Sequence, residues 1–263
     1  MLNYIYKYTF KCLTKGKFSK KGRNFLGRVC TIGRGGGNKR LYRFINFIRR
    51  INFFGIIFKV LYDPNRTSRI CFVLFKNGLI ACLLKIEGQK RGTLLYCGIN
   101  LKEKIVTEIN FKLLNGYSLP LKEIKLFTVV SNIEKKPFQG GTLCRVGGGG
   151  CMFYGKDDSD GFLKLRSGWH IKVPIECMAS IGKIGKKNLR IIGSAGKNRG
   201  LGFRPKVRGV AKNPCDHPHG GGNGKKAKPP VPRNAWSTVF KWEHTKKKKN
   251  EKLKRYKLKT IFE

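Results

Sequence analysis

The pattern of hydrophobic and polar positions divides the chain into two sets of short strands. Residues 39–87 are rich in β-branched and aromatic residues with little helical periodicity, which predicts strands at LYRFINFI, FGIIFKVLY, RICFVLFK and LIACLLKIE. Asp63-Pro64-Asn65 is a turn signal, and Asn77-Gly78 predicts a tight hairpin. Strands of this length and spacing favour a small antiparallel barrel.

The second strand set follows a charged connector at residues 101–114. Its segments read FTVVSNIE, TLCRV, CMFY, GFLKLR and WHIKVP, with Gly147–Gly150 among them, and they predict a second small barrel ending near Lys186. The expected fold class is therefore mostly β. We expect a basic N-terminal extension over residues 1–32, a first barrel over 33–112, a second over 113–190, and an extended basic tail over 191–263.

The charge of the chain changes this picture most. The 263 residues include 57 Lys and Arg and 14 Asp and Glu, which gives a net charge of +43. Residues 1–62 hold 15 basic and no acidic side chains, and residues 178–263 hold 24 and 4. A chain so unbalanced repels itself, so we expect two basic arms that bind a polyanion, with nucleic acid the leading candidate. The arms are too polar to order without that partner.

Composition excludes several other classes of protein. The longest apolar stretch, near Ile51–Leu61, is interrupted by Asn52, Gly55 and Lys59 and is shorter than the ~20 residues of a membrane span. The nine cysteines include no C-x-x-C pair. We interpret them as reduced, mostly buried thiols rather than a disulfide framework or a zinc site. Heavy use of Phe, Ile, Lys, Asn and Tyr is typical of an A/T-rich organellar genome.

A glycine-rich segment, GRGGGNKRLYR at Gly33–Arg43, is the first candidate binding motif. Glycine lets a backbone approach a phosphate, and the neighbouring Arg and Lys side chains supply charged donors. A flexible loop with solvated charges is the alternative. A dinucleotide fingerprint fails because Asn38 stands where glycine is needed, and a P-loop fails because Arg28-Val29 replaces Lys-Ser/Thr.

The segment Cys215–Gly222, CDHPHGGG, places Cys, Asp and two His within five residues. These residue types could form a catalytic site or a metal site. On an extended, proline-interrupted chain, however, adjacent side chains point in different directions, so we favour a loop threaded through folded RNA. We interpret Asp157, Asp158 and Asp160 as a solvated turn rather than a metal site. We therefore predict no catalytic residue and no metal ligand.

Four motifs in one order resemble the universal large-subunit ribosomal protein two family, of the bacterial and organellar type. They are GRN at Gly22, GGGNKRLYR, YDPNRTSRI, and GSAGKNRGLGFRPKVRGVAKNPCDHPHGGG at Gly193–Gly222. The resemblance runs from about Lys21 to about Gly224. It implies an oligonucleotide-binding-fold barrel followed by a Src-homology-3-like barrel. It also implies extensions that reach into rRNA near the peptidyl transferase centre, and a non-enzymatic role in subunit assembly, subunit association and translation.

The resemblance also assigns roles to particular residues. Arg66 and Arg145 match family arginines needed for rRNA binding, and His217 matches a histidine close to the reaction centre, where we favour an RNA-anchoring role. The expected RNA-binding residues are Arg34, Gly35, Gly36, Gly37, Lys39, Arg40, Arg43, Arg66, Arg69, Arg145, Lys197, Arg199, Arg204, Arg208, Lys212, Asn213, His217 and His219. Those expected near the peptidyl transferase centre are Asp216, His217, Pro218, His219 and Gly220.

The expected partners follow from the same resemblance. They are large-subunit rRNA, neighbouring large-subunit proteins, and the small subunit across the subunit interface. We expect no cofactor, with Mg²⁺ ions held by the rRNA, and a location in the mitochondrial matrix, with a plastid as the alternative. Two other hypotheses remain: an RNA chaperone or packaging protein acting outside the ribosome, and an enzyme that uses His217.

Overall fold

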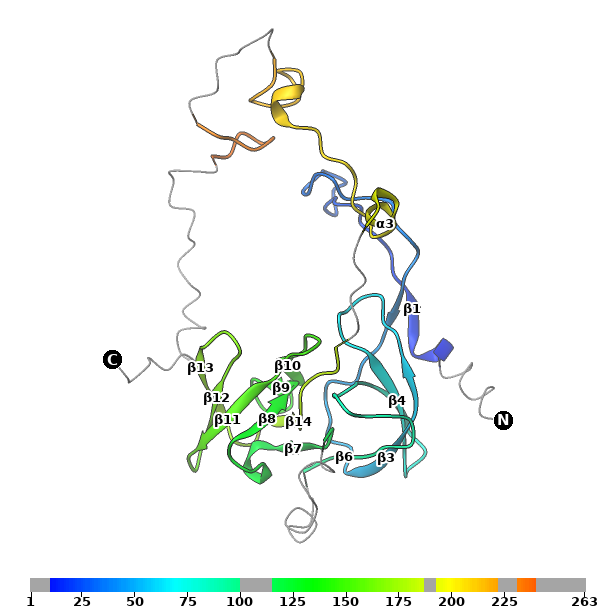
Figure 1. Cartoon of the computed structure of the whole chain (residues 1–263), viewed down its shortest axis with the longest axis vertical. Coiled ribbons are helices and arrows are strands. Elements are labelled where there is room, and N and C mark those ends of the chain that lie inside the picture. Colours follow the sequence, from blue (N-terminus) through cyan, green and yellow to red (C-terminus); the bar gives the residue numbers. More distant parts are fainter. Residues whose placement is uncertain (1–9, 100–114, 187–192, 222–230, 240–263) are drawn as a thin grey trace. The chain divides into compact units, whose positions relative to one another are not determined.

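Strands make up most of the regular structure in this computed structural model, which describes residues 10–99, 115–186, 193–221 and 231–239 (Figure 1). The chain divides into two units. Unit 1 comprises Met1–Lys17, Arg40–Arg190 and Lys252–Glu263, and unit 2 comprises Phe18–Lys39 and Ile191–Glu251.

The first strand set of unit 1 contains β3 (Phe53–Leu61), β4 (Ile70–Phe75), β5 (Ile80–Leu84) and β6 (Leu94–Cys97). β3 pairs antiparallel with β4 and β6, and β4 pairs antiparallel with β5. Because successive side chains of a strand face opposite ways, β4 lines two hydrophobic clusters. Cys71 and Val73 belong to the larger cluster, and Ile70 and Phe72 to the smaller. The predicted hairpin at Asn77-Gly78 is confirmed.

The second strand set has strands at all five predicted segments and two further strands that were not predicted, Ser118–Pro120 and Met178–Ile181. Its six main strands are β7 (Ser118–Pro120), β8 (Thr128–Ser131), β11 (Cys151–Lys156), β12 (Asp160–Lys164), β13 (His170–Pro174) and β14 (Met178–Ile181). A short 3-10 helix, η1 (Leu121–Glu123), follows β7, and β9 (Ile133–Glu134) pairs with β10 (Gly141–Leu143) as a separate ribbon.

The two strand sets are joined within unit 1. β6 and β7 run parallel and meet at the pair Cys97 and Ser118, which links ten strands in the order β13-β12-β11-β8-β14-β7-β6-β3-β4-β5. The larger hydrophobic cluster takes Leu95 from the first set and Leu119 and Phe153 from the second. The mostly-β prediction with two successive strand sets is therefore confirmed, and the sets share one core.

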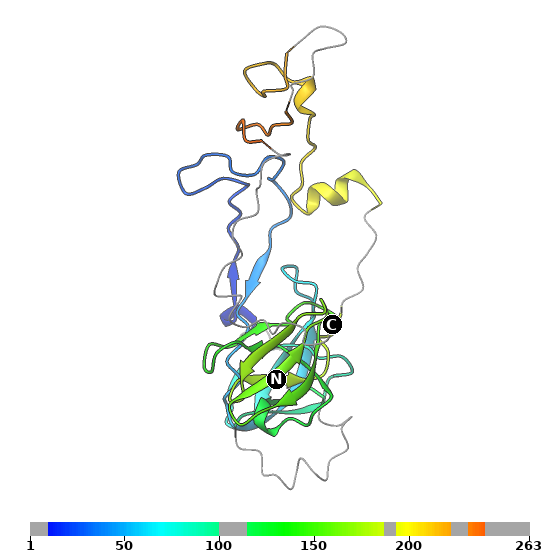
Figure 2. The ribbon, with the colours of Figure 1, turned by 90° about the vertical axis from the view of Figure 1, so that its left-hand side faces the viewer.

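The strand predicted over residues 41–48 is wrong beyond its first three residues. Only β2 (Leu41–Arg43) is a strand, and it pairs with β1 (Thr14–Gly16) to form the ribbon (blue) seen in Figure 2. The following residues are irregular, and Ile45 and Phe47 pack onto the smaller hydrophobic cluster. Residues 18–39, which connect the two strands of this ribbon in sequence, belong to unit 2.

Unit 2 joins segments far apart in sequence, which the chain's pattern did not predict. The Gly35 and Asn38 N–H groups donate to the Gly202 and Gly200 carbonyls at 3.1 and 2.9 Å, and the Arg204 N–H donates to the Gly33 carbonyl at 3.0 Å. Residues 33–39, expected at the start of the first barrel, thus belong to unit 2. Its helices are short: α3 (Ala195–Gly200) and the 3-10 helix η2 (Gly209–Ala211).

Candidate nucleic-acid interface

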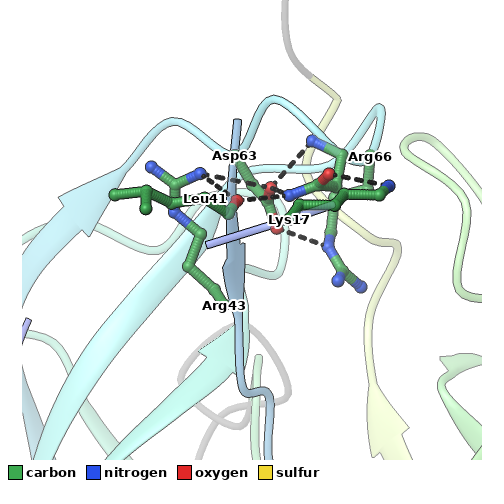
Figure 3. Close-up of polar contacts among 6 residues, drawn as sticks. Lys17, Leu41, Arg43, Asp63 and Arg66 are labelled. Atoms are coloured by element: carbon green, nitrogen blue, oxygen red, sulfur yellow. Dashed lines mark hydrogen bonds and ion pairs between the residues drawn. The ribbon is translucent and has the colours of Figure 1, made fainter. Parts of the chain in front are cut away.

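A buried carboxylate organises the turn between β3 and β4. Asp63 is fully buried and accepts a hydrogen bond at 2.6 Å from Nε of Arg66, three residues later, and it forms a 3.7 Å ion pair with NH1 of Arg43 (Figure 3). The Asn65 N–H donates to the same carboxylate at 2.8 Å. The Arg66 side chain stays 21% exposed. Its guanidinium is therefore fixed on one edge by the carboxylate while the side chain still reaches solvent.

The same turn fastens the β1–β2 ribbon to the first strand set. Asn65 donates through Nδ2 to the Leu41 carbonyl at 2.7 Å and accepts from Nζ of Lys17 at 3.1 Å (Figure 3). The Lys17 N–H in turn donates to the Arg40 carbonyl at 3.0 Å. Lys17, Arg43 and Arg66 thus gather around one turn although they come from three separate segments.

A loop from the second strand set packs against this turn. The Gly147 N–H donates to Oγ1 of Thr67 at 3.1 Å, and a Cβ at Gly147 would lie 2.5 Å from the Thr67 carbonyl oxygen. Ser68 forms an isolated bridge with Lys186. The close approach explains why glycine stands at position 147. The same loop carries Arg145, which is exposed and whose guanidinium lies 4.8 Å from the Phe47 ring centre.

Unit 2 presents a second cationic surface built on backbone contacts. The Arg34 guanidinium lies 4.1 Å above the Phe203 ring, and the two residues form an isolated bridge. Gly37 has a φ of +92°, and a Cβ there would lie 3.0 Å from the Gly202 backbone. Glycine at 37 is thus required by contact between the two segments rather than by a phosphate. A Cβ added at Gly36 would meet nothing within 4 Å, so the Gly36 backbone is open to a ligand.

The CDHPHGGG segment is a closed loop, so the extended conformation assumed from its sequence is wrong. The Asp216 and His217 N–H groups donate to the Asn213 carbonyl at 3.0 and 3.3 Å, and the Gly221 N–H donates to the Lys212 carbonyl at 2.9 Å. Prolines at 214 and 218 set turns here rather than an extended chain. What the segment can do chemically therefore depends on the contacts of the histidines themselves.

Both histidines accept hydrogen bonds from backbone N–H groups. Nδ1 of His217 accepts the His219 N–H at 3.0 Å, and Nε2 of His219 accepts the Arg233 N–H at 2.8 Å. Burial, reinforced by His219 and Lys212, lowers the pKa of His217 from its ordinary value. The lowered pKa favours the neutral imidazole, whose Nδ1 can accept the His219 N–H as observed.

Three fully buried cysteines of unit 1 are packing residues. Burial raises the pKa of Cys71 to about 12, that of Cys97 to about 11 and that of Cys177 to about 12, so these thiols stay protonated. Within the described ranges no three His, Cys, Asp or Glu side chains converge as metal ligands would. In the same part of the chain, no helix has the length and apolar character needed to cross a membrane.

The structure distributes the predicted RNA-binding residues over both units. Unit 1 holds Arg40, Arg43, Arg66, Arg69 and Arg145, and unit 2 holds Arg34, Gly35, Gly36, Gly37, Lys39, Lys197, Arg199, Arg204, Arg208, Lys212, Asn213, His217 and His219, together with Asp216, Pro218 and Gly220. Sequence reasoning missed Lys17, Asp63 and Asn65 as members of the site. The Asp-Pro-Asn turn was recognised, but nothing in it indicated which distant cations its carboxylate and amide would hold.

Comparisons with known proteins match the chain to one family. Residues 10–97 match the family model described as "Ribosomal Proteins L2, RNA binding N-terminal domain", and residues 114–237 match "Ribosomal Proteins L2, C-terminal domain". Similar proteins named "Large ribosomal subunit protein uL2" occur in Rickettsia canadensis, Rickettsia bellii and Rickettsia typhi. Each is 40% identical, over 91% of this chain and 85% of the relative.

Proposed function

The chain belongs to the ribosomal protein L2 family, and from that premise we propose how its surfaces act in the large ribosomal subunit. It is a structural, RNA-binding constituent of that subunit rather than an enzyme. Its partner is the rRNA, and the remaining questions are which surfaces bind and where.

The observation that carries the proposal is the cluster of cations around the buried Asp63. Arg66 and Arg43 are held by the Asp63 carboxylate, and Lys17 is held by Asn65, at 2.6, 3.7 and 3.1 Å respectively. Cations fixed in this way lose little side-chain entropy on binding, so they suit a rigid array of phosphates. Phosphate contacts set the register and orientation of a protein on nucleic acid. Unit 1 therefore docks on folded rRNA through this turn.

Unit 2 is proposed to enter the rRNA near the peptidyl transferase centre. Supporting this are the closed loop at 209–221, the lowered pKa of His217, and the large excess of basic over acidic residues in unit 2. In this position residues Asp216–Gly220 anchor the RNA, and the rRNA itself catalyses peptide-bond formation. The protein requires no cofactor of its own, and Mg²⁺ ions are held by the rRNA. Contacts with neighbouring proteins and with the small subunit are part of the same proposal.

The proposed location is the mitochondrial matrix, with a plastid as the alternative. Its support is the heavy use of residues with A/T-rich codons together with likeness to bacterial relatives. Sedimentation of organellar extract tests it together with the ribosomal role. We expect the chain to be present in stoichiometric amounts in large subunits of mitochondria. Recovery in RNA-bound particles outside the ribosome would favour an RNA chaperone instead.

Charge reversal tests the docking surface directly. Arg66→Glu should weaken binding to large-subunit rRNA and flatten its dependence on salt, because each lost phosphate contact removes roughly one counterion from the salt slope. Arg145→Glu should act similarly without disturbing the ion pair to Asp63. Lys164→Glu, on the exposed face of β12, is the matched control. Equal rRNA affinity for all three variants would contradict the proposed surface.

The role of His217 is separable from assembly. His217→Ala in assembled subunits should leave the rate of peptide-bond formation unchanged once incorporation is equalised, because His217 anchors RNA. A lower rate in fully assembled subunits would restore the catalytic hypothesis.

A further inference from the structure

An exposed row of aliphatic side chains crosses the first strand set of unit 1. Ile56 on β3 pairs with Leu74 on β4 and with Leu94 on β6, and Leu74 pairs with Ile80 on β5. Residues directly opposite one another project from the same face of a sheet, so the four side chains form a continuous row. Ile56, Leu74 and Leu94 are 48%, 45% and 54% exposed. We call Ile56, Leu74, Ile80 and Leu94 the aliphatic row.

The row continues the face that carries the smaller hydrophobic cluster. Ile70, Phe72 and Leu74 project from the same face of β4 because alternate residues do so. Ile70 and Phe72 are fully buried, with Phe10 and Leu13 among the side chains that pack against their cluster. The cover ends before Leu74. A sheet face that is packed at one end is thus exposed at the other, within the described residues.

The aromatic side chain of Phe54 extends the same exposed area. Phe54 lies opposite Tyr96, and their rings are 5.0 Å apart. Phe54 is 38% exposed, whereas Tyr96 is buried. Contiguous apolar surface of this kind marks protein interfaces rather than ordinary solvent-facing surface.

The charges around the aliphatic row are mostly positive. Lys76 lies two residues beyond Leu74 on the same face of the chain, and Lys90 and Arg91 lie in the turn that leads into Leu94; all three are exposed. Between Phe53 and Leu94 the only carboxylates are the buried Asp63 and the exposed Glu87. An apolar surface with this rim is complementary to apolar side chains flanked by Asp or Glu. RNA fits it poorly, because aliphatic groups cannot replace the hydration of phosphates.

The row lies at the far end of the β3–β4 hairpin from the Asp63 turn. The pair Leu61 and Ile70 borders the turn, and the pair Ile56 and Leu74 lies roughly 15 Å away at about 3.3 Å per residue. We propose that the aliphatic row docks a protein of the large subunit whose contact surface is apolar and flanked by carboxylates. This inference rests on the proposed function, since rRNA at the turn leaves the row available for a different partner.

Site-specific crosslinking in purified large subunits tests the inference. The full chain carries a benzophenone side chain at position 74, and a second version carries it at position 62, beside Asp63. We expect position 74 to yield a crosslink to another protein that survives ribonuclease, and the captured peptide to contain apolar residues and Asp or Glu. Position 62 should yield a crosslink to rRNA.

Several outcomes would overturn the inference. One is a crosslink from position 74 to rRNA. Another is a crosslink from position 74 to residues 1–9 or to a second copy of this chain. A third is the absence of any crosslink at position 74 when position 62 does crosslink to rRNA. If neither version enters large subunits, the proposed function fails, and this is seen in the sedimentation profile before irradiation. The two failures are therefore distinguishable.

A charge-reversal pair tests the predicted chemistry of the partner. Lys76→Glu combined with Lys90→Glu should lower the crosslink yield at position 74 roughly tenfold, because like charges then face each other. Lys164→Glu is the control and should leave the yield unchanged. An undiminished yield from the double variant would contradict an acidic partner.

Discussion

Units 1 and 2 differ in what holds each together. Every buried hydrophobic side chain of the described residues belongs to unit 1, where two clusters fill the strand sets. Unit 2 contributes none, and its segments meet through backbone hydrogen bonds, glycine contacts and the stacking of Arg34 on Phe203. The described part of unit 1 carries 25 basic and 8 acidic residues, and that of unit 2 carries 13 basic residues and one acid, Asp216.

This difference separates folding from binding within one chain. Hydrophobic burial drives unit 1 to fold without a partner. Unit 2 has no such driving force, and its net positive charge opposes compaction. A polyanion that binds only the ordered form stabilises that form by mass action. We therefore predict that unit 1 folds alone and that the order of unit 2 depends on rRNA.

The largest expected effect contrasts an aromatic residue in each unit. Phe153→Ala, in the fully buried core of unit 1, should lower the free energy of unfolding by about 3–5 kcal/mol. Phe203→Ala, in unit 2, should change it by less than about 0.5 kcal/mol in the free protein, yet weaken rRNA binding. Urea unfolding followed by circular dichroism measures both. Similar losses of stability from the two variants would remove the contrast.

Asp63→Asn tests whether the docking turn belongs to the self-folding unit. The change leaves Arg43 and Arg66 without their carboxylate, so we expect a loss of about 2–3 kcal/mol in unfolding free energy and weaker rRNA binding. The control is Asp160→Asn, whose partner Lys172 is 45% exposed, and it should cost less than about 1 kcal/mol. Equal unfolding curves for the two variants would count against the role of Asp63.

Gly37→Ala sharpens the comparison from the side of unit 2. Both Gly37 and Gly36 have positive φ, but only Gly37 has the Gly202 backbone within 3.0 Å of a Cβ position. Gly37→Ala should therefore cost about 1 kcal/mol more in rRNA binding than Gly36→Ala, while neither changes the unfolding of unit 1. A filter-binding titration against large-subunit rRNA measures the difference. If Gly36→Ala is the more harmful, contact between residues 37 and 202 does not organise the unit.

The smallest expected effect is a pH dependence confined to the 209–221 loop. The pKa of His217 is lowered in the folded loop by burial and by the nearby His219 and Lys212, so the folded loop binds a proton less readily than the open loop. Stability of the loop is therefore fully present above the ordinary value of about 6.5 and falls as the pH drops through it. NMR titration of the His217 ring in the free protein, where no bound phosphate raises its pKa, measures this. A midpoint above the ordinary value would contradict the closed loop.

The strands were more predictable from the sequence than the positions of the cations. β3, β4 and β5 follow segments whose β-branched and aromatic residues serve packing on both faces, so composition alone identified them. β1, β7 and β14 have three or four residues each, too few for an alternating pattern, and their pairing depends on tertiary contacts. Local pattern carries no information about such partners.

The site shows the same division. The Arg66 and Arg145 positions were inferred from motifs, but the turn of Arg66 meets the loop of Arg145 through the contact of Gly147 with Thr67, 80 residues apart. The pairing of Gly35 with Gly202 is likewise a contact between glycines far apart in sequence. Charge and composition predict two separate basic arms and do not predict that the arms pair. The candidate RNA-binding residues could be recognised in the sequence. Which of them lie close together could be known only from the fold.

Hydrogen exchange of the full chain, with and without large-subunit rRNA, tests the division between the two units most directly. Without RNA, we predict slow exchange in β3, β4, β11 and β12 and fast exchange at Gly35, Asn38 and Arg204 of unit 2. With rRNA bound, the latter amides should become protected while those of the strands change little. Slow exchange of the unit 2 amides in the absence of any polynucleotide would contradict the account.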